Sequence, residues 1–237
     1  MIVPFLLTIS ILAFTIFFFR KSLCRLLPQP EFFEDCHWSK TMASSRSHLE
    51  AEGSQKRLLC VLGSGGHTME MIQMLKTISP TEFCPRIYLI SNTDSLSRSK
   101  LNQLEERWNS SVGIDYVIYK IPRSREVGQS WFTTPFSVIQ TLIVSFHILV
   151  NEVPDLVIAN GPGSCVPVFL ASRILRRLPF VCIPNKALRL MYIESLARVK
   201  QLSLTGRILY PISDFFIVQW PNLLKNYPKS IYRGIMV

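Results

Sequence analysis

The sequence predicts an α/β fold in which helices cover both faces of a Rossmann-like parallel sheet. Three observations lead to this prediction. Short apolar runs alternate with longer stretches of helical periodicity from residue 58 onward. A glycine-rich turn follows the first apolar run directly. Apolar residues make up 48% of the 237 residues, which suffices for one substantial core.

The expected elements alternate along the chain. Strands are predicted at 58–62, 86–90, 115–121, 155–159 and 214–219, and helices at 67–78, 95–107, 135–150 and 165–177. The apolar face of the first helix is formed by Met71, Ile72, Leu75 and Ile78. A further strand has two candidates, 180–183 and 190–193, because extra sequence at 184–189 separates two apolar runs.

An uncleaved transmembrane anchor is predicted at residues 1–21. The first 19 residues carry no charge and span about 28 Å as a helix, close to the ~30 Å of a bilayer core. A cleaved signal peptide would need a basic start and a small-x-small cleavage site, which this stretch lacks. Arg20, Lys21 and Arg25 follow the apolar run. The positive-inside rule therefore places the remaining chain in the cytosol.

A flexible linker is predicted over 22–56, because 28–56 is rich in Pro, Ser, Glu and Lys and lacks apolar periodicity. The Rossmann-like domain then occupies 57–237. The six cysteines are scattered without a C-x-x-C pair, so no metal site is expected. The formal charge of +10 is dispersed and accompanies no nucleic-acid motif. Attraction to an anionic membrane surface explains it more simply.

The segment 61–68 joins the first strand to the first helix and reads Val-Leu-Gly-Ser-Gly-Gly-His-Thr. Three glycines in four positions let the backbone turn sharply, and the start of the following helix favours an anion. His67 adds a group that can donate or accept a proton beside the ligand. The residues expected to bind a phosphate group are Gly63, Ser64, Gly65, Gly66 and Thr68.

Other glycine motifs fit this loop less well. A P-loop would need Gly and Lys where Thr68 and Met69 stand. The dinucleotide fingerprint matches at Gly63 and Gly65, but Thr68 replaces its last glycine. Asp94 is placed to act as the ribose-binding acid, so a membrane-tethered NAD(P)-dependent oxidoreductase remains an alternative. A tight turn with a surface histidine is another.

Two further loops follow strands at the same sheet edge. Arg123 and Arg125 suit a diphosphate or a lipid headgroup, because guanidinium groups grip phosphate oxygens in pairs. Solvated charge, or pairing with the neighbouring glutamate, is the alternative. Asn160, Gly161 and Gly163 form a second glycine loop that could contact a diphosphate, a facing subunit, or neither if it is simply a tight turn.

Glu194 ends the apolar run 190–193. A carboxylate at a strand end can hold sugar hydroxyls or deprotonate one, and structural capping of the next segment is the alternative. The aromatic residues Trp131, Phe132 and Phe136 suit a membrane interface. The run 133–150 that includes Phe136 is apolar enough to lie against lipid, but we expect a buried core helix rather than a second membrane span.

Five stretches together closely resemble one family: GSGGHT (63–68), IPRSREVGQSW (121–131), PDLVIANGPGSCVP (154–167), YIES (192–195) and SDFFIVQWP (213–221). The family is asparagine-linked glycosylation protein fourteen, the membrane-anchored subunit of the endoplasmic-reticulum UDP-N-acetylglucosamine transferase. The resemblance runs from about residue 58 to the C-terminus. The first loop is also similar to one in the bacterial transferase that makes lipid II. The extra stretch 184–189 departs from the family.

The resemblance implies the acceptor-side half of a split GT-B glycosyltransferase, anchored by one span in the endoplasmic-reticulum membrane and facing the cytosol. About 180 residues remain after the anchor and linker, enough for one of the two GT-B domains. A separate soluble subunit would bind UDP-GlcNAc, so no cofactor is expected on this chain. Their product would be dolichol-diphosphate chitobiose, with His67 and Glu194 as catalytic candidates. No nucleic acid is expected as a partner.

The C-terminus is apolar and needs a surface to bury against. The resemblance implies that the catalytic partner docks on it; packing on the chain's own sheet is the alternative. The residues expected to bind the partner are Ile231, Tyr232, Ile235, Met236 and Val237. A purely structural recruiter without catalytic groups remains a competing function, and it would have no need of His67.

Overall fold

A computed structural model describes residues 55–125, 128–130, 132–178 and 188–237. The predicted anchor at 1–21, nearly all of the predicted linker and the candidate strand at 180–183 lie outside these residues. The prediction for 57–237 can therefore be compared with the structure over most of its length.

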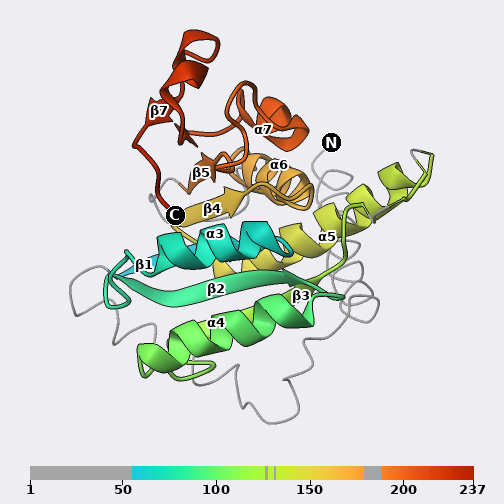
Figure 1. The fold of residues 1–237 in the computed structure, drawn as a ribbon. Helices are drawn as coiled ribbons and strands as arrows, with labels where there is room; N and C mark the ends of the chain where they lie inside the picture. Colours follow the sequence, from blue (N-terminus) through green and yellow to red (C-terminus); the bar gives the residue numbers. More distant parts are fainter. Residues whose placement is uncertain (1–54, 126–127, 131, 179–187) are drawn as a thin grey trace, which may run out of the picture. The chain divides into compact units, whose positions relative to one another are not determined.

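In the described part of the chain seven strands form one sheet, and every neighbouring pair is parallel. The strands are β1 (Lys56–Val61), β2 (Phe83–Ser91), β3 (Tyr116–Ile121), β4 (Leu156–Asn160), β5 (Arg189–Ile193), β6 (Phe215–Val218) and β7 (Ile231–Tyr232). Their order across the sheet is β3-β2-β1-β4-β5-β6-β7 (Figure 1). This order confirms the predicted Rossmann-like α/β fold.

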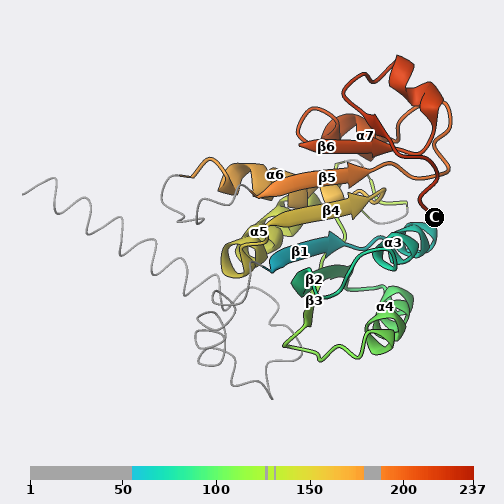
Figure 2. The same cartoon turned by 90° about the vertical axis from the view of Figure 1, so that its left-hand side faces the viewer.

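Helices fill the connections between the strands. They are α3 (Gly66–Leu75), α4 (Ser95–Arg107), α5 (Thr134–Glu152), α6 (Cys165–Leu175), α7 (Leu204–Leu209) and the 3₁₀ helix η1 (Pro221–Lys225). Right-handed crossovers that lead in opposite directions from the centre of the sheet place their helices on opposite faces. Accordingly, α3 and α4 pack on one face and α5 and α6 on the other (Figure 2).

The core lies on both faces of the central strands. Residues 58–62, in β1 and just after it, are all at most 3% exposed, which explains why this run is continuously apolar rather than alternating. Met71 and Leu75 of α3 are fully buried against the sheet. Because α3 packs so closely, the loop that precedes it is held at a defined place above the end of β1.

The structure also settles where the fifth strand lies and adds elements that the pattern did not predict. Residues 189–193 form β5, so the second of the two candidate runs is the sheet strand. The sequence pattern missed α7, η1 and β7, which are all short. It also began β2 three residues too late, because Pro85 interrupts the strand pattern.

The helix α5 is buried at one end and exposed at the other. Val144, Ile148 and Leu149 are buried in its carboxyl-terminal half. In contrast, Phe136 is 75% exposed and Ile139 53% exposed in its amino-terminal half. Figure 1 shows this end of the helix running past the body of the fold. The expectation of a buried core helix therefore holds for half of α5, which is by length and composition the one described helix able to cross a membrane.

Candidate functional site

The two glycine loops lie side by side at the centre of the sheet. β1 is paired with β2 on one side and β4 on the other. The connections from β1 and β4 lead to opposite faces, which makes the carboxyl ends of these strands the topological switch point. Ligands of open α/β sheets bind in the crevice at this point. The loop at residues 63–66 follows β1, and the loop at residues 161–164 follows β4.

His67, in the first turn of α3, is enclosed by glycines from both loops. A Cβ added to Gly63 would lie 2.8 Å from the Cβ of His67. A Cβ added to Gly161 would lie 2.2 Å from the imidazole Nδ1 and Cε1 atoms. Gly161 also has a φ of +74°, a backbone conformation that L side chains rarely adopt. These two glycines therefore make room for the histidine ring, which is partly exposed.

A chain of hydrogen bonds extends from His67 into the protein. Its Nδ1 atom lies 3.0 Å from Oδ1 of Asn160, whose Nδ2 group donates to Oε2 of Glu70 at 2.9 Å. The hydroxyl of Ser195 donates to Oε1 of Glu70 at 2.8 Å. Neither Glu70 nor Ser195 was predicted from the sequence to belong to the site. The signal for Glu70 was its position three residues after His67, on the same face of the helix.

The other side of the loop at residues 63–66 is open. Ser64, Gly65 and Gly66 are exposed, and a Cβ added to Gly65, Gly66 or Gly163 would meet nothing within 4 Å. In the described part of the chain no side chain caps the start of α3. Its first N–H groups are therefore available to a ligand rather than satisfied by the helix. This arrangement offers an anion several N–H donors beside the histidine.

Thr68 differs from the other predicted phosphate-binding residues because its side chain is buried. Its hydroxyl donates to the carbonyl of Gly63 and lies 2.5 Å from the hydroxyl of Ser97. Ser97 in turn donates to Asp94, which caps α4 through both carboxylate oxygens. In this structure the Thr68 hydroxyl therefore stabilises the turn rather than facing a ligand. Asp94 is used in the same way, which weakens the dinucleotide alternative.

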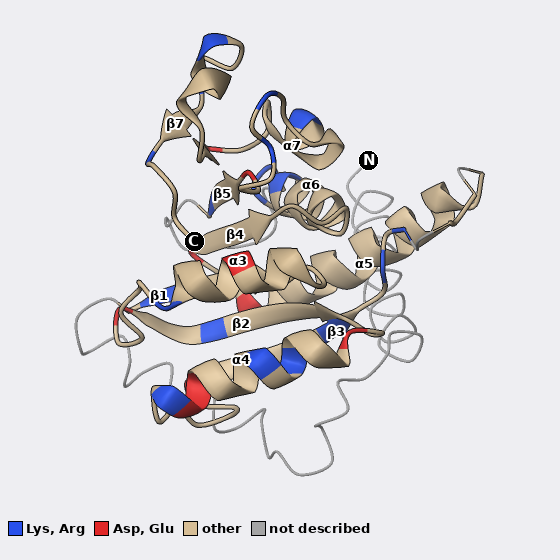
Figure 3. Ribbon diagram, viewed as in Figure 1, with Lys and Arg blue, Asp and Glu red and all other residues tan. Residues whose placement is uncertain are grey.

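The two arginines lie at the carboxyl end of β3, separated from β1 by β2. Nε of Arg123 donates to the hydroxyl of Ser91 at 3.0 Å, and Arg125 is exposed. They therefore flank the glycine loops on the sheet edge that also carries His67. Their predicted contact with a diphosphate is not tested by the structure. Figure 3 shows the basic positions spread over several elements rather than gathered on one helix or strand.

Glu194 follows β5 and is fully buried. Its carboxylate accepts from the N–H of Ser195 at 3.1 Å, and from the N–H and hydroxyl of Ser203 at 3.0 and 3.1 Å. A Cβ added to Gly206 would lie 2.1 Å from Oε2. Burial raises the pKa of this carboxyl, and the bonds from Ser203 and Ser195 oppose the rise. This geometry favours the structural alternative; the catalytic role of Glu194 stays a prediction.

The C-terminal segment divides between the chain's own sheet and the surface. Ile231 and Tyr232 form β7 and pair with β6. Met236 packs against the core, and its N–H donates to Oε1 of Gln219 at 3.0 Å. The side chain of Tyr232 is 42% exposed and that of Ile235 is 59% exposed. Val237 is also exposed, so three of the five predicted partner-binding residues remain accessible.

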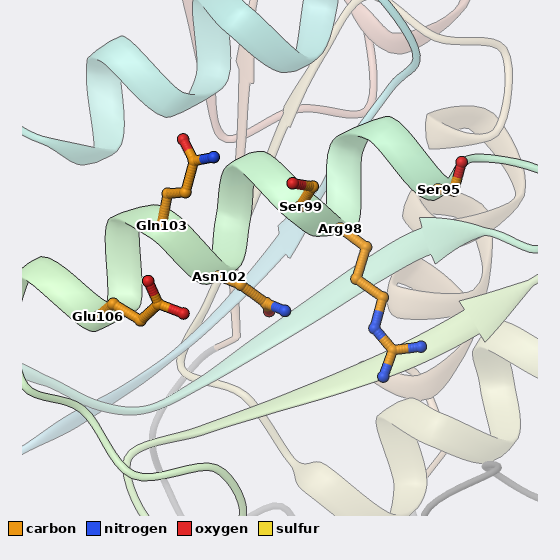
Figure 4. Close-up of a pocket in the computed structure, with 6 residues that line it drawn as sticks. All are labelled: Ser95, Arg98, Ser99, Asn102, Gln103 and Glu106. Atoms are coloured by element: carbon orange, nitrogen blue, oxygen red, sulfur yellow. The ribbon is translucent and has the colours of Figure 1, made fainter.

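In the described ranges no group of three His, Cys, Asp or Glu side chains could hold a metal ion. A surface pocket lies on α4 (Figure 4). It is lined by the polar side chains Ser95, Arg98, Ser99, Asn102, Gln103 and Glu106. None of these six was predicted to take part in function.

The sequence was compared with known families and curated proteins. The family described as "Oligosaccharide biosynthesis protein Alg14 like" matches residues 58–236. The protein named UDP-N-acetylglucosamine transferase subunit ALG14 from Homo sapiens is 43% identical over 184 residues, which cover 76% of this chain and 82% of that protein. The protein of that name from Schizosaccharomyces pombe is 40% identical over 77% of this chain and 84% of its own length.

Solved structures resemble the fold at low sequence identity. MurG from Acinetobacter baumannii has a TM-score of 0.51 and 18% identity. A putative UDP-N-acetylglucosamine 2-epimerase from Listeria monocytogenes has a TM-score of 0.50 and 13% identity. The match covers 76% of this chain but 45% of the MurG chain. The chain therefore spans less than half the length of that structure, and the similarity establishes the fold.

Proposed function

The chain belongs to the Alg14-like family of oligosaccharide biosynthesis proteins, and from this premise we propose that it is the acceptor-binding, membrane-anchoring subunit of a UDP-N-acetylglucosamine transferase. It adds the second GlcNAc to GlcNAc-diphosphate-dolichol together with a soluble subunit that binds UDP-GlcNAc. The proposal is supported by the names of the relatives and by a fold that spans 45% of the MurG chain. A partner would supply the second domain.

The observation that carries this proposal is the enclosure of His67 between two glycine loops at the switch point of the sheet. The open N–H groups at the start of α3 hold the acceptor diphosphate, while the arginines after β3 attract it. His67 takes the proton from the attacking sugar hydroxyl. The hydroxyl oxygen then bonds to the anomeric carbon of the donor sugar, and UDP leaves toward the partner subunit. A purely structural recruiter would not require this arrangement.

The exposed end of α5 supports placement at a membrane. Phe132 is 90% exposed and Phe136 75% exposed, at the sheet edge where Arg123 and Arg125 also lie. Aromatic side chains favour the membrane interface, and basic side chains favour anionic headgroups. We therefore place this end of α5 against the cytosolic face of the endoplasmic-reticulum membrane. The acceptor lipid would then reach the glycine loops without leaving the bilayer.

The exposed part of the C-terminal segment is proposed to recruit the partner. Tyr232, Ile235 and Val237 present apolar surface next to the outermost strand. Exchanging Ile235 for Asp should release the partner into the soluble fraction while this chain sediments with the membranes. Full retention of the partner would show that the segment serves this chain's own sheet alone.

The decisive test measures transferase activity with lipid-diphosphate-GlcNAc as acceptor, in membranes that contain this chain with and without the soluble partner. Activity should require both chains. His67→Ala should lower kcat/KM at least tenfold, because a positioned general base typically contributes 10²–10⁴-fold. A loss in kcat above about 1,000-fold indicates the base, whereas a loss mainly in acceptor KM indicates phosphate binding.

His147→Ala is the matched control, because His147 lies in the carboxyl-terminal half of α5 and outside the proposed site. The control should keep normal activity. Co-purification of the partner should be unchanged in both variants. If the His67→Ala complex assembles and keeps full activity, the chain acts as a scaffold rather than in catalysis.

A further inference from the structure

The hydrogen bonds that lead away from His67 have a direction set by chemistry. An ionised carboxylate only accepts hydrogen bonds, so Glu70 requires a donor from Asn160. The NH₂ group of the Asn160 amide therefore faces Glu70, at 2.9 Å. Its carbonyl oxygen then faces Nδ1 of His67, at 3.0 Å. Because an amide oxygen cannot donate, Nδ1 must carry the proton.

We propose that Glu70 is a positioning residue that acts through Asn160 to hold His67 in the Nδ1–H tautomer. In the neutral ring this tautomer leaves Nε2 with a free lone pair. Nε2 is then able to take a proton and is unable to donate a hydrogen bond to phosphate. The inference rests on the proposed function, and it selects the general base over the phosphate ligand as the role of His67.

Burial of Asn160 and Ser195 helps Glu70 to hold His67 in one tautomer. Asn160 is 1% exposed and Ser195 4% exposed, whereas His67 and Glu70 are partly exposed, so one partner of each bond is shielded from water. The Ser195 hydroxyl holds the second carboxylate oxygen of Glu70 at 2.8 Å. Rotation of the Asn160 amide would bring its oxygen against the Glu70 carboxylate and leave a buried acceptor pair unsatisfied, which is costly. Gly161 meanwhile leaves the room that the ring occupies.

The arrangement also suits the protonated state. When Nε2 has accepted the proton, Nδ1–H still donates to Asn160, and no amide needs to turn. The Glu70 carboxylate lies on the far side of Asn160 from the ring and continues to accept from the Asn160 amide. The network therefore needs no rearrangement during the proton transfer. Preorganisation of this kind lowers the barrier because no reorientation is needed at the moment of reaction.

The first measurement is the tautomer itself, observed by ¹⁵N NMR on histidine-labelled chain in complex with its partner. The chain has four histidines, and comparison with His67→Ala assigns the relevant signal. We expect Nδ1 protonated and Nε2 unprotonated above the pKa of the ring. A neutral ring protonated at Nε2 overturns the proposal, whatever the kinetic results.

The second measurement releases the amide with Glu70→Met, a substitution of similar length that replaces the carboxylate with a thioether, a much weaker hydrogen-bond acceptor. We expect the Nδ1–H population to fall, kcat to drop about 10- to 100-fold, and acceptor KM to change less than about threefold. Glu106→Met, at an exposed position on α4, is the matched control and should behave as the wild type. A wild-type kcat in Glu70→Met, or a loss of kcat with an unchanged tautomer, overturns the proposal.

The third measurement is a rescue. In the Glu70→Met/Asn160→Asp double variant the new carboxylate accepts directly from Nδ1–H and needs no help from residue 70. We expect the Nδ1–H tautomer to return and kcat to recover at least tenfold over Glu70→Met. The acid limb of the pH–kcat profile should move to higher pH, because an adjacent carboxylate raises the pKa of the imidazolium. A restored tautomer without recovery of kcat overturns the proposal.

These outcomes separate the inference from the proposed function. If His67→Ala keeps full activity while the NMR signal shows Nδ1–H, the tautomer assignment stands and the catalytic role fails. If His67→Ala loses activity while the ring is protonated at Nε2, the catalytic role stands and the positioning by Glu70 fails.

Discussion

His67 and Glu194 both come shortly after a strand at the same edge of one sheet, yet their surroundings differ. His67 follows the central strand β1 and is partly exposed, with open space over the neighbouring glycines. Glu194 follows β5, two strands away, and is fully buried among groups that donate to it. The first residue is accessible to a ligand, and the second is bonded within the protein; the catalytic role of each stays a prediction.

The comparison shows that a strand end is a necessary feature of such a site but does not define one. What differs is the direction of the connections on either side. The connections that follow β1 and β4 run to opposite faces of the sheet, which opens space between their loops. β4 and β5 continue in one direction, and the segment after β5 folds over its own strand end. An ionisable residue there is covered by its own loop.

The largest effect is expected from Gly161→Ala, which attacks the enclosure of His67 directly. The new Cβ would lie 2.2 Å from the ring, at a residue with φ of +74°. The ring must move, so kcat/KM should fall about 10²- to 10⁴-fold, as for loss of a positioned base. Gly113→Ala is the control, because Gly113 also has a positive φ (+81°) but precedes β3, at the opposite edge of the sheet from His67. Equal activity of the two variants would show that the ring position does not matter.

A smaller effect, on stability rather than chemistry, is expected from Glu194→Gln. The amide loses one acceptor oxygen for the Ser203 or Ser195 donors, so the free energy of unfolding should fall by about 1–3 kcal/mol. Activity per folded molecule should change less than about threefold. Chemical denaturation and steady-state kinetics on the same preparation measure both quantities. A thousandfold loss of kcat in folded protein would restore Glu194 as a catalytic residue.

The free energies of unfolding of wild type and Glu194→Gln, compared as a function of pH, test the cause of the raised pKa of Glu194. Burial raises the pKa of Glu194 in the folded chain. The folded state therefore binds this proton more tightly than the unfolded state. The contribution of the protonated Glu194 carboxyl to stability is fully present below its pKa in the unfolded state. This contribution is lost as the pH rises through its pKa in the folded state. The stability of wild type relative to Glu194→Gln should accordingly decline as the pH rises from the unfolded to the folded pKa. A relative stability that grows with pH would mean that the bonds from Ser203 and Ser195 outweigh burial.

The smallest effect is expected from Thr68→Val, which removes a hydroxyl while keeping the side-chain shape. The hydroxyl donates to the carbonyl of Gly63 inside the turn. Its loss should lower the free energy of unfolding by about 1 kcal/mol and raise acceptor KM by less than about threefold. Thermal unfolding and acceptor titrations measure these changes. A tenfold rise in KM without loss of stability would return Thr68 to the phosphate-binding residues.

The fold was predictable because its signals are local. Residues 58–62 are apolar without interruption and the glycines follow at once, so the central strand, the turn and α3 could be read from one stretch. β7 was missed because two residues carry no periodicity. The strand at 189–193 remained one of two candidates, since apolar character alone does not show which run pairs with β4.

The site was predictable in part, for a related reason. His67 stands beside glycines, and that combination is visible along the sequence. The contact between Glu70 and Ser195 joins residues 125 positions apart, and the sequence contains no local sign of it. Burial of the Thr68 hydroxyl was equally hidden, because it depends on Ser97 of another helix. Residues that position other residues are recognised from distances rather than from motifs.

The pairing of β1 with β4 ties catalysis to the order of folding. These strands meet across a long stretch of chain: the N–H of Arg57 bonds to Asp155, 98 residues away, and His67 meets Asn160 across 93. Closing such a loop costs chain entropy before any contact repays it, so parallel pairings of this kind form slowly. A chain still being synthesised at residue 150 contains His67 and Glu70 but lacks Asn160, which lies between them in the hydrogen-bond chain. The proposed chemistry therefore requires the long-range closure of the sheet, and a half-folded chain should lack it.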